Sequence, residues 1–169
     1  MELETKVLSR ELQQRMYDNG LTIGTAESCT GGRVAEAIIA TPGASKYFKG
    51  GVICYSNEVK ENLLGVSAQV LAEKSAVSEE VAIQMVKGAC ETLKTDYTVA
   101  VTGYAGPVAG ENDGVPVGTI WVACGTKDNT LTLKLNEDFG RDINLAIATN
   151  RALRLMLDFL EQEKGAATE

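Results

Sequence analysis

The feature that most constrains the fold is a repeated alternation of short apolar runs with helical stretches along the 169 residues. Runs typical of strands cover 21–26, 51–55, 97–101, 119–124 and 130–135. Apolar residues recur at helical spacing over 4–19, from Gly32 to about 40, over 58–64 and 67–74, after Ser78, which is a good helix cap, and over 141–160.

This order of elements predicts an α/β fold with one three-layer α/β/α domain spanning 1–169. Helices between successive strands are the usual crossovers of a parallel sheet, whereas the close pair 119–124 and 130–135 is typical of a hairpin. We therefore expect a mostly parallel mixed sheet of about five strands with one antiparallel strand. The small, polar end at 165–169 should be frayed.

The absence of histidine restricts the chemistry of the chain. It excludes Ser-His-Asp triads, Cys-His pairs and every histidine metal site, so a catalytic base must be Lys, Tyr, Asp or Glu. The four cysteines at 29, 54, 90 and 124 lack the paired spacing of zinc or redox motifs. We interpret them as reduced, mostly buried thiols.

Charge and hydropathy bear on partners and location. A net charge of −7 and a pI near 4.8 argue against a surface that binds nucleic acid. No run approaches the roughly 18 apolar residues of a membrane span, and residues 1–10 alternate charges instead of forming a signal-peptide core. We expect a cytoplasmic protein with a small-molecule ligand and no membrane or nucleic-acid partner.

Polar residues follow the first predicted strand, where ligands bind in open α/β sheets. The segment Ser28-Cys29-Thr30-Gly31-Gly32 leads into a helix, and its hydroxyls and free backbone amides suit an anion or oxyanion. An equally good alternative is that Ser28 or Thr30 only caps the helix. Cys29 is a competing nucleophile, and Glu27 suits an orienting acceptor or the partner of a cation.

Two further strand ends carry candidate groups. Tyr55 ends the second strand, and the next helical turn can bring Lys60 to the same edge. For Lys60 to act as a base at neutral pH, burial or neighbouring cations would have to lower its pKa by about three units from roughly 10.4. Thr102 begins a glycine-rich segment, and Arg141 starts the last helix with a guanidinium suited to a phosphate or carboxylate. The alternatives without a functional role are a solvated surface lysine at position 60, a structural turn after Thr102 and an ordinary surface arginine at position 141.

Taken together, these motifs closely resemble the CinA carboxy-terminal family over nearly the whole chain. The segments that carry the resemblance are Thr25-Ala26-Glu27-Ser28-Cys29-Thr30-Gly31-Gly32, Tyr55-Ser56-Asn57-Glu58 with Lys60, Gly65-Val66, Ala76-Val77-Ser78-Glu79, Val101-Thr102-Gly103 with Ala105-Gly106-Pro107, and Pro116-Val117-Gly118-Thr119. The family includes nicotinamide mononucleotide deamidases, so the resemblance implies hydrolysis of that carboxamide to nicotinate mononucleotide and ammonia.

The resemblance also implies roles for individual residues. Ser28 would attack the amide carbon and Lys60 would accept its proton, with Tyr55 and Thr102 completing the catalytic site. Substrate contacts would come from the groups at Thr30, Gly31, Gly32, Ser45, Gly103, Gly106 and Arg141. No metal or other cofactor is expected. The resemblance further implies a homodimer or larger homo-oligomer and a stand-alone form of the family.

One segment departs from the family pattern. After Pro107 the family often carries a Gly-Gly pair and a Glu-rich stretch, whereas this chain has Val108-Ala109-Gly110-Glu111-Asn112-Asp113-Gly114 before Val115. The alternative function is therefore a catalytically silent family member that binds a pyridine nucleotide. Acceptance of other pyridine nucleotides and a redox role for Cys29 stay open.

Overall fold

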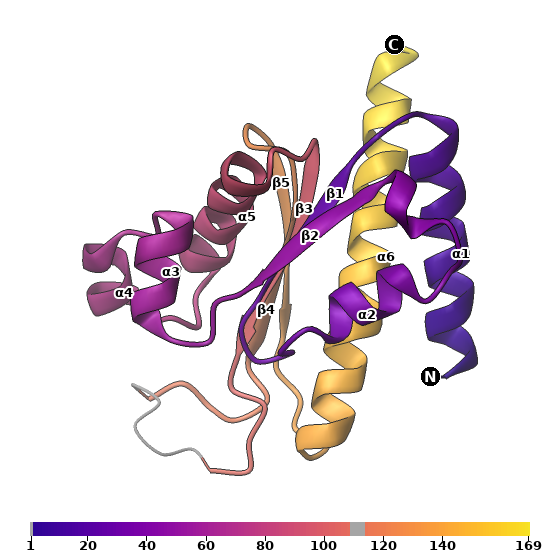
Figure 1. Cartoon of the computed structure of the whole chain (residues 1–169). Coiled ribbons are helices and arrows are strands. Elements are labelled where there is room, and N and C mark those ends of the chain that lie inside the picture. The colour runs from indigo at the N-terminus through magenta and orange to yellow at the C-terminus, as the bar shows by residue number, and fades with distance from the viewer. Residues whose placement is uncertain (1, 109–113) are drawn as a thin grey trace.

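The computed structural model describes residues 2–108 and 114–169. They form one five-stranded sheet in the order β2-β1-β3-β4-β5, with helices on both faces (Figure 1). The strands are β1 (Ile23–Glu27), β2 (Phe48–Ile53), β3 (Tyr97–Gly103), β4 (Ile120–Gly125) and β5 (Thr130–Leu135). β1 pairs in parallel with β2 and β3, and β4 runs antiparallel to both β3 and β5. The predicted mixed sheet with one antiparallel strand is confirmed.

The helices form the two outer layers of the predicted α/β/α arrangement. One face of the sheet carries α1 (Leu3–Asp18), α2 (Arg33–Ile39) and α6 (Arg141–Ala167), and the other carries α3 (Asn57–Leu64), α4 (Ala68–Lys74) and α5 (Glu79–Leu93). A short 3₁₀ helix, η1 (Ala44–Lys46), precedes β2. Because side chains alternate along a strand, β3 sends Val99 and Val101 into the core under α6, and Ala100 into the core under α5.

Local sequence signals explain where several helices begin. The side chains of Ser56, Ser67 and Ser78 accept hydrogen bonds from backbone amides in the first turns of α3, α4 and α5. These bonds satisfy amide groups that have no partner within the helix. The predicted cap at Ser78 is confirmed, and α3 and α5 thereby start at fixed points beside the sheet.

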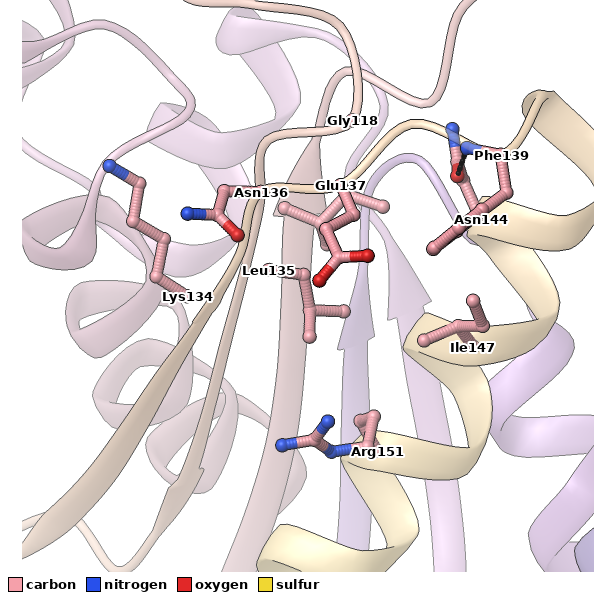
Figure 2. Close-up of a pocket in the computed structure, with 10 residues that line it drawn as sticks. Gly118, Lys134, Leu135, Asn136, Glu137, Phe139, Asn144, Ile147 and Arg151 are labelled. Atoms are coloured by element: carbon pink, nitrogen blue, oxygen red, sulfur yellow. Dashed lines mark hydrogen bonds between the residues drawn. The ribbon is translucent and has the colours of Figure 1, made fainter.

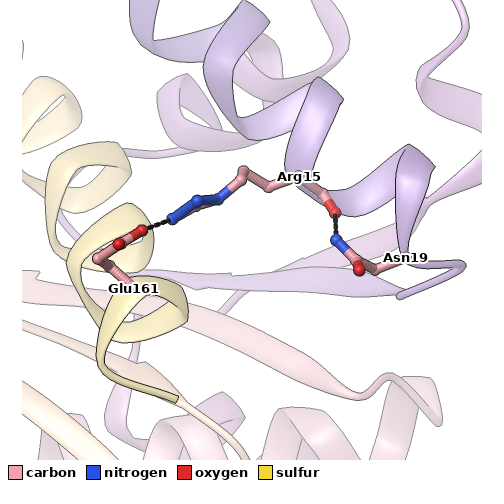
Figure 3. A network of polar contacts seen from close by, with 3 residues as sticks. All are labelled: Arg15, Asn19 and Glu161. Carbon is pink, nitrogen blue, oxygen red and sulfur yellow. Dashed lines mark hydrogen bonds and ion pairs between the residues drawn. The ribbon is translucent and has the colours of Figure 1, made fainter. Parts of the chain in front are cut away.

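Some predicted boundaries were wrong. β2 begins at Phe48 instead of residue 51, since Gly50 and Gly51 interrupt the apolar pattern but still pair with β1, after a register shift between Phe48 and Gly50. β3 continues through Thr102 and Gly103. The last helix continues past residue 160 to Ala167, so the frayed end expected at 165–169 is helical for most of its length. In this region Figure 3 shows Arg15 of α1 facing Glu161 of α6, an exposed ion pair.

Candidate active site

Ser28 lies directly after β1, at the carboxyl edge of the parallel strands. Its backbone amide donates to the carbonyl of Val101 at 2.9 Å, which keeps it beside β3, and the residue is 7% exposed. Strand alternation directs Ala26 and Ser28 toward the face that carries α3 and α5, while Glu27 points to the α2 face. The strand thus presents the Ser28 hydroxyl to the helix that contains Lys60.

Lys60 extends from α3 to the Ser28 hydroxyl. Its Nζ lies 2.9 Å from Ser28 Oγ and donates to the Cys54 carbonyl at 2.7 Å, and the residue is only 1% exposed. Burial lowers the pKa of Lys60 from its ordinary value, because the charged ammonium loses hydration. The one ion pair found within 2–108 and 114–169 joins Arg15 to Glu161, so no described carboxylate pairs with Lys60. Compared with water, these surroundings therefore shift the balance toward the neutral amine beside the Ser28 hydroxyl.

A cavity of about 370 Å³ opens at this place. It brings together the predicted site residues Ser28, Tyr55, Lys60, Thr102, Gly103, Gly106 and Arg141. Tyr55 is 62% exposed at the edge of the cavity. Arg141, the first residue of α6, donates from Nη1 to the Gly106 carbonyl at 2.8 Å. This bond ties the guanidinium to the glycine-rich segment beside the cavity.

Thr102 is the neighbour of Ser28 on β3. The register pairs Glu27 with Val101, so the next residues of the two parallel chains, Ser28 and Thr102, share a face. The Thr102 hydroxyl donates to the Ala76 carbonyl at 2.9 Å. With its proton engaged, the hydroxyl can offer only its oxygen lone pairs to a ligand.

The remaining predicted substrate residues do not line this cavity. Thr30 is buried with no hydrogen-bond partner for its hydroxyl in the described structure, and Gly31 and Gly32 form the turn behind Ser28 at φ values of 57° and 107°. Ser45 lies in η1, before β2, whereas the cavity lies after β2. Within one chain, Ser45 is therefore at the opposite end of the sheet from Ser28.

The cavity also contains residues to which the sequence analysis gave no role. Asn57, Ala76, Val77 and Tyr104 line it. Asn57 and Ala76 stand in the motifs that carry the family resemblance, which is the one sequence signal that could have found them. Tyr104 follows β3 directly, and its position beside α4 and α5 depends on how those helices pack on the sheet.

Cys29 lines the same cavity, but its environment opposes nucleophilic chemistry. Burial raises the pKa of the Cys29 thiol to about 12, although the positive charge of Arg141 acts in the opposite direction. The thiolate, which is the reactive form, is therefore scarce at neutral pH. All four cysteines are buried and free, as the sequence predicted.

A second cavity of about 370 Å³ lies between β5 and α6 (Figure 2). Its wall combines the apolar side chains of Leu135 and Ile147 with Glu137 and Arg151. Unlike the Ser28 cavity, it shows no hydrogen-bonded pair of a potential nucleophile and base among its described residues. We therefore place the candidate chemistry at Ser28.

Within residues 2–108 and 114–169, no group of three or more His, Cys, Asp or Glu side chains is arranged to hold a metal ion. None of the helices there is long and apolar enough to cross a membrane. The unusual segment from Val108 to Val115 falls mainly on 109–113, outside the described residues.

Comparison with known proteins identifies the family. The profile of the CinA C-terminal domain matches residues 5–160. The chain belongs to the CinA C-terminal domain family. It is 39% identical to protein YdeJ of Escherichia coli K12, covering 90% of this chain and 88% of YdeJ. It is 43% identical to nicotinamide-nucleotide amidohydrolase PncC of the same organism, covering 73% of this chain and 74% of PncC.

Other members of the CinA C-terminal domain family differ in length. The chain is 41% identical to a putative competence-damage inducible protein of Halothermothrix orenii over 91% of this chain, but spans only 37% of that protein. Among solved structures, a CinA superfamily protein from Klebsiella pneumoniae 700603 matches with a TM-score of 0.89 at 34% identity, covering 94% of this chain and 98% of that one. The fold and the family are thus shown together.

Proposed function

We propose that this CinA-family chain hydrolyses the carboxamide of nicotinamide mononucleotide, giving nicotinate mononucleotide and ammonia. The observation that carries the proposal is the buried contact between Lys60 Nζ and Ser28 Oγ at 2.9 Å, without a described carboxylate to hold the lysine charged. The similarity to PncC, a nicotinamide-nucleotide amidohydrolase, supports the choice of substrate.

The first half of the proposed reaction forms an ester. A neutral Lys60 amine keeps one N–H on the Cys54 carbonyl and uses its lone pair to accept the Ser28 proton. Ser28 Oγ then bonds to the carbonyl carbon of the amide, whose oxygen becomes an oxyanion. Lys60 returns the proton to the amide nitrogen, the C–N bond breaks, and ammonia leaves.

The second half consumes water. Lys60 accepts a proton from a water molecule that attacks the Ser28 ester, and returns a proton to Ser28 Oγ as the ester bond breaks. The product is a carboxylic acid, which ionises. The reaction therefore needs water and no redox partner.

The surrounding groups support this assignment. The backbone amide of Cys29 adjoins the nucleophile, and Cys29 lines the cavity, so this amide suits an oxyanion donor. The Thr102 oxygen, with its own proton on Ala76, can accept from the amide NH₂ of the substrate. Arg141 suits the phosphate, and we place Tyr55 against the substrate at the open edge.

The test is ammonia release from nicotinamide mononucleotide by the purified protein, with and without chelator. We expect Ser28→Ala and Lys60→Met to lower kcat by about 10³-fold or more, as for other nucleophile–base pairs, while both variants stay folded. Turnover that survives in both variants would overturn the mechanism. Binding of the nucleotide without turnover by the unmodified protein would instead favour the silent pyridine-nucleotide-binding relative.

A further inference from the structure

Glu27 is a buried carboxylate that the proposed reaction does not use. It ends β1 and is 1% exposed. Its carbonyl accepts from the Cys54 amide at 2.8 Å, so its backbone is fixed to the chain that follows β2. No described cation forms an ion pair with it, since the ion pair within the described ranges is Arg15–Glu161. A buried charge in this position requires another source of stabilisation.

That stabilisation comes from the first turn of α2. Glu27 Oε1 accepts from the Val34 amide at 2.8 Å, and Oε2 accepts from the Ala35 amide at 3.0 Å. These amides are among those that a helix cannot satisfy internally, and the helix amino terminus favours a negative charge. Both carboxylate oxygens are thus engaged at one helix end.

The two hydrogen bonds close a loop of the chain that contains the nucleophile, Ser28. Glu27 immediately precedes Ser28, and Val34 lies seven positions after Glu27. The enclosed segment contains Gly31 and Gly32, whose φ values are 57° and 107°. Glycine has access to more backbone conformations than other residues, so without a restraint this turn would adopt many of them. Fixing both ends of the segment removes much of that freedom, so the carboxylate restrains the chain that carries Ser28 Oγ.

The side of the sheet on which the Glu27 carboxylate lies affects the protonation of Lys60. Ser28 faces Lys60, and Glu27 faces α2 on the opposite side. A carboxylate on the Ser28 side would pair with Lys60 and favour the ammonium, which cannot accept a proton. Bound to two amides, Glu27 restrains the turn while its charge stays directed away from the base.

We propose that Glu27 is a positioning residue whose carboxylate, bound to the Val34 and Ala35 amides, holds the Ser28–Gly32 turn in the geometry that places Ser28 Oγ against Lys60. This inference rests on the proposed amidohydrolase function for its catalytic consequence. Its structural part, the restraint of the turn, can be measured without any turnover.

The experiment compares Glu27→Gln with Glu36→Gln, which removes an exposed carboxylate from the same first turn of α2. In Glu27→Gln the side-chain NH₂ group, which cannot accept a hydrogen bond, faces the backbone amide of either Val34 or Ala35. Hydrogen exchange at these two amides should therefore accelerate in Glu27→Gln and stay unchanged in Glu36→Gln. We expect kcat to fall about 10- to 100-fold in Glu27→Gln, with KM and the number of nucleotide-binding sites within about twofold of the unmodified protein. The pH at half-maximal kcat should stay the same, because Lys60 is untouched.

Glu27→Asp separates geometry from charge and provides a second variant if Glu27→Gln does not fold. It keeps the charge but is one methylene shorter, so we expect it to fold and to lose both exchange protection and kcat. Unchanged exchange in a folded variant, or lost protection with full kcat, would overturn the positioning role. If the unmodified protein releases no ammonia, the proposed function fails by itself, and hydrogen exchange still decides whether Glu27 orders the turn.

Discussion

At the scale of single residues, Lys60 depends most strongly on its surroundings. An exposed lysine is protonated at neutral pH, whereas this side chain is buried against Ser28 and Cys54. Burial lowers its pKa, so the neutral base forms at a lower pH than it does in an exposed lysine. We expect kcat/KM to increase with pH to a plateau whose midpoint lies below the ordinary lysine value of about 10.4. A pH–rate profile checks this; a midpoint at or above that value would contradict it.

The same lowered pKa predicts how stability changes with pH. Between the folded and unfolded pKa values of Lys60, the unfolded chain binds more protons than the folded one, so the free energy of unfolding rises with pH in that window. Lys60→Met removes this dependence. Urea unfolding of both proteins at several pH values tests it, and parallel pH curves would show that burial does not shift the lysine.

Cys29 supplies a contrasting prediction at the same scale. With a pKa of about 12, the thiol is about 10⁵ times more abundant than the thiolate at pH 7. We expect Cys29→Ala to retain ammonia release within about threefold, because Ser28 supplies the nucleophile in our proposal. Iodoacetamide should modify Cys29 slowly in the folded protein and rapidly after denaturation, as mass spectrometry would show. A loss of turnover in Cys29→Ala as large as that in Ser28→Ala would instead favour the Cys29 thiol as the nucleophile.

At the scale of elements, the position of α3 depends on a close approach to α5. A Cβ added at Gly88 of α5 would lie 1.8 Å from the carbonyl oxygen of Leu64, the last residue of α3. Only a glycine lets these two helices meet at this separation, and α3 carries Lys60. The helix contact is therefore part of the active-site geometry, although Gly88 itself does not line the cavity.

We expect Gly88→Ala to destabilise the protein by about 1–3 kcal/mol, the usual cost of overpacking, and to lower kcat by displacing Lys60. Gly165→Ala is the matched control, since nothing lies within 4 Å of the added Cβ and alanine favours a helix. Chemical unfolding and ammonia release measure the two effects. Equal stability of the two variants would contradict the close-approach argument.

At the scale of the whole molecule, α1 closes the layer that contains α2 and α6 (Figure 1). Two kinds of contact hold it there. Leu12 is fully buried in the core beneath α6, whereas the Arg15–Glu161 pair is exposed to solvent (Figure 3). Buried apolar area dominates such packing, and exposed ion pairs contribute little.

The two contacts predict unequal effects within one helix. We expect Leu12→Ala to cost about 2–5 kcal/mol of unfolding free energy, from lost burial and the cavity left behind, and Arg15→Ala to cost about 1 kcal/mol or less. KM for the nucleotide should remain unchanged in both, because α1 lies on the face opposite Lys60. Urea titrations at low and high salt decide this, and a larger loss in Arg15→Ala would refute it.

The amino-acid sequence alone determined the order of strands and helices, the mixed sheet and the family. It also determined that Ser28 follows a strand and that, without histidine, lysine is a possible base. These conclusions depend on local periodicity, turn residues and composition, which a linear chain displays directly.

Only the tertiary structure decided which groups meet. Ser28 and Lys60 are 32 positions apart, and their contact depends on strand register and on the packing of α3 against α5. The same three-dimensional arrangement engages the Thr102 proton at Ala76 and leaves Ser45 at the far end of the sheet. Distances between remote residues are set by the packing of elements on one another, and no short stretch of sequence contains that information.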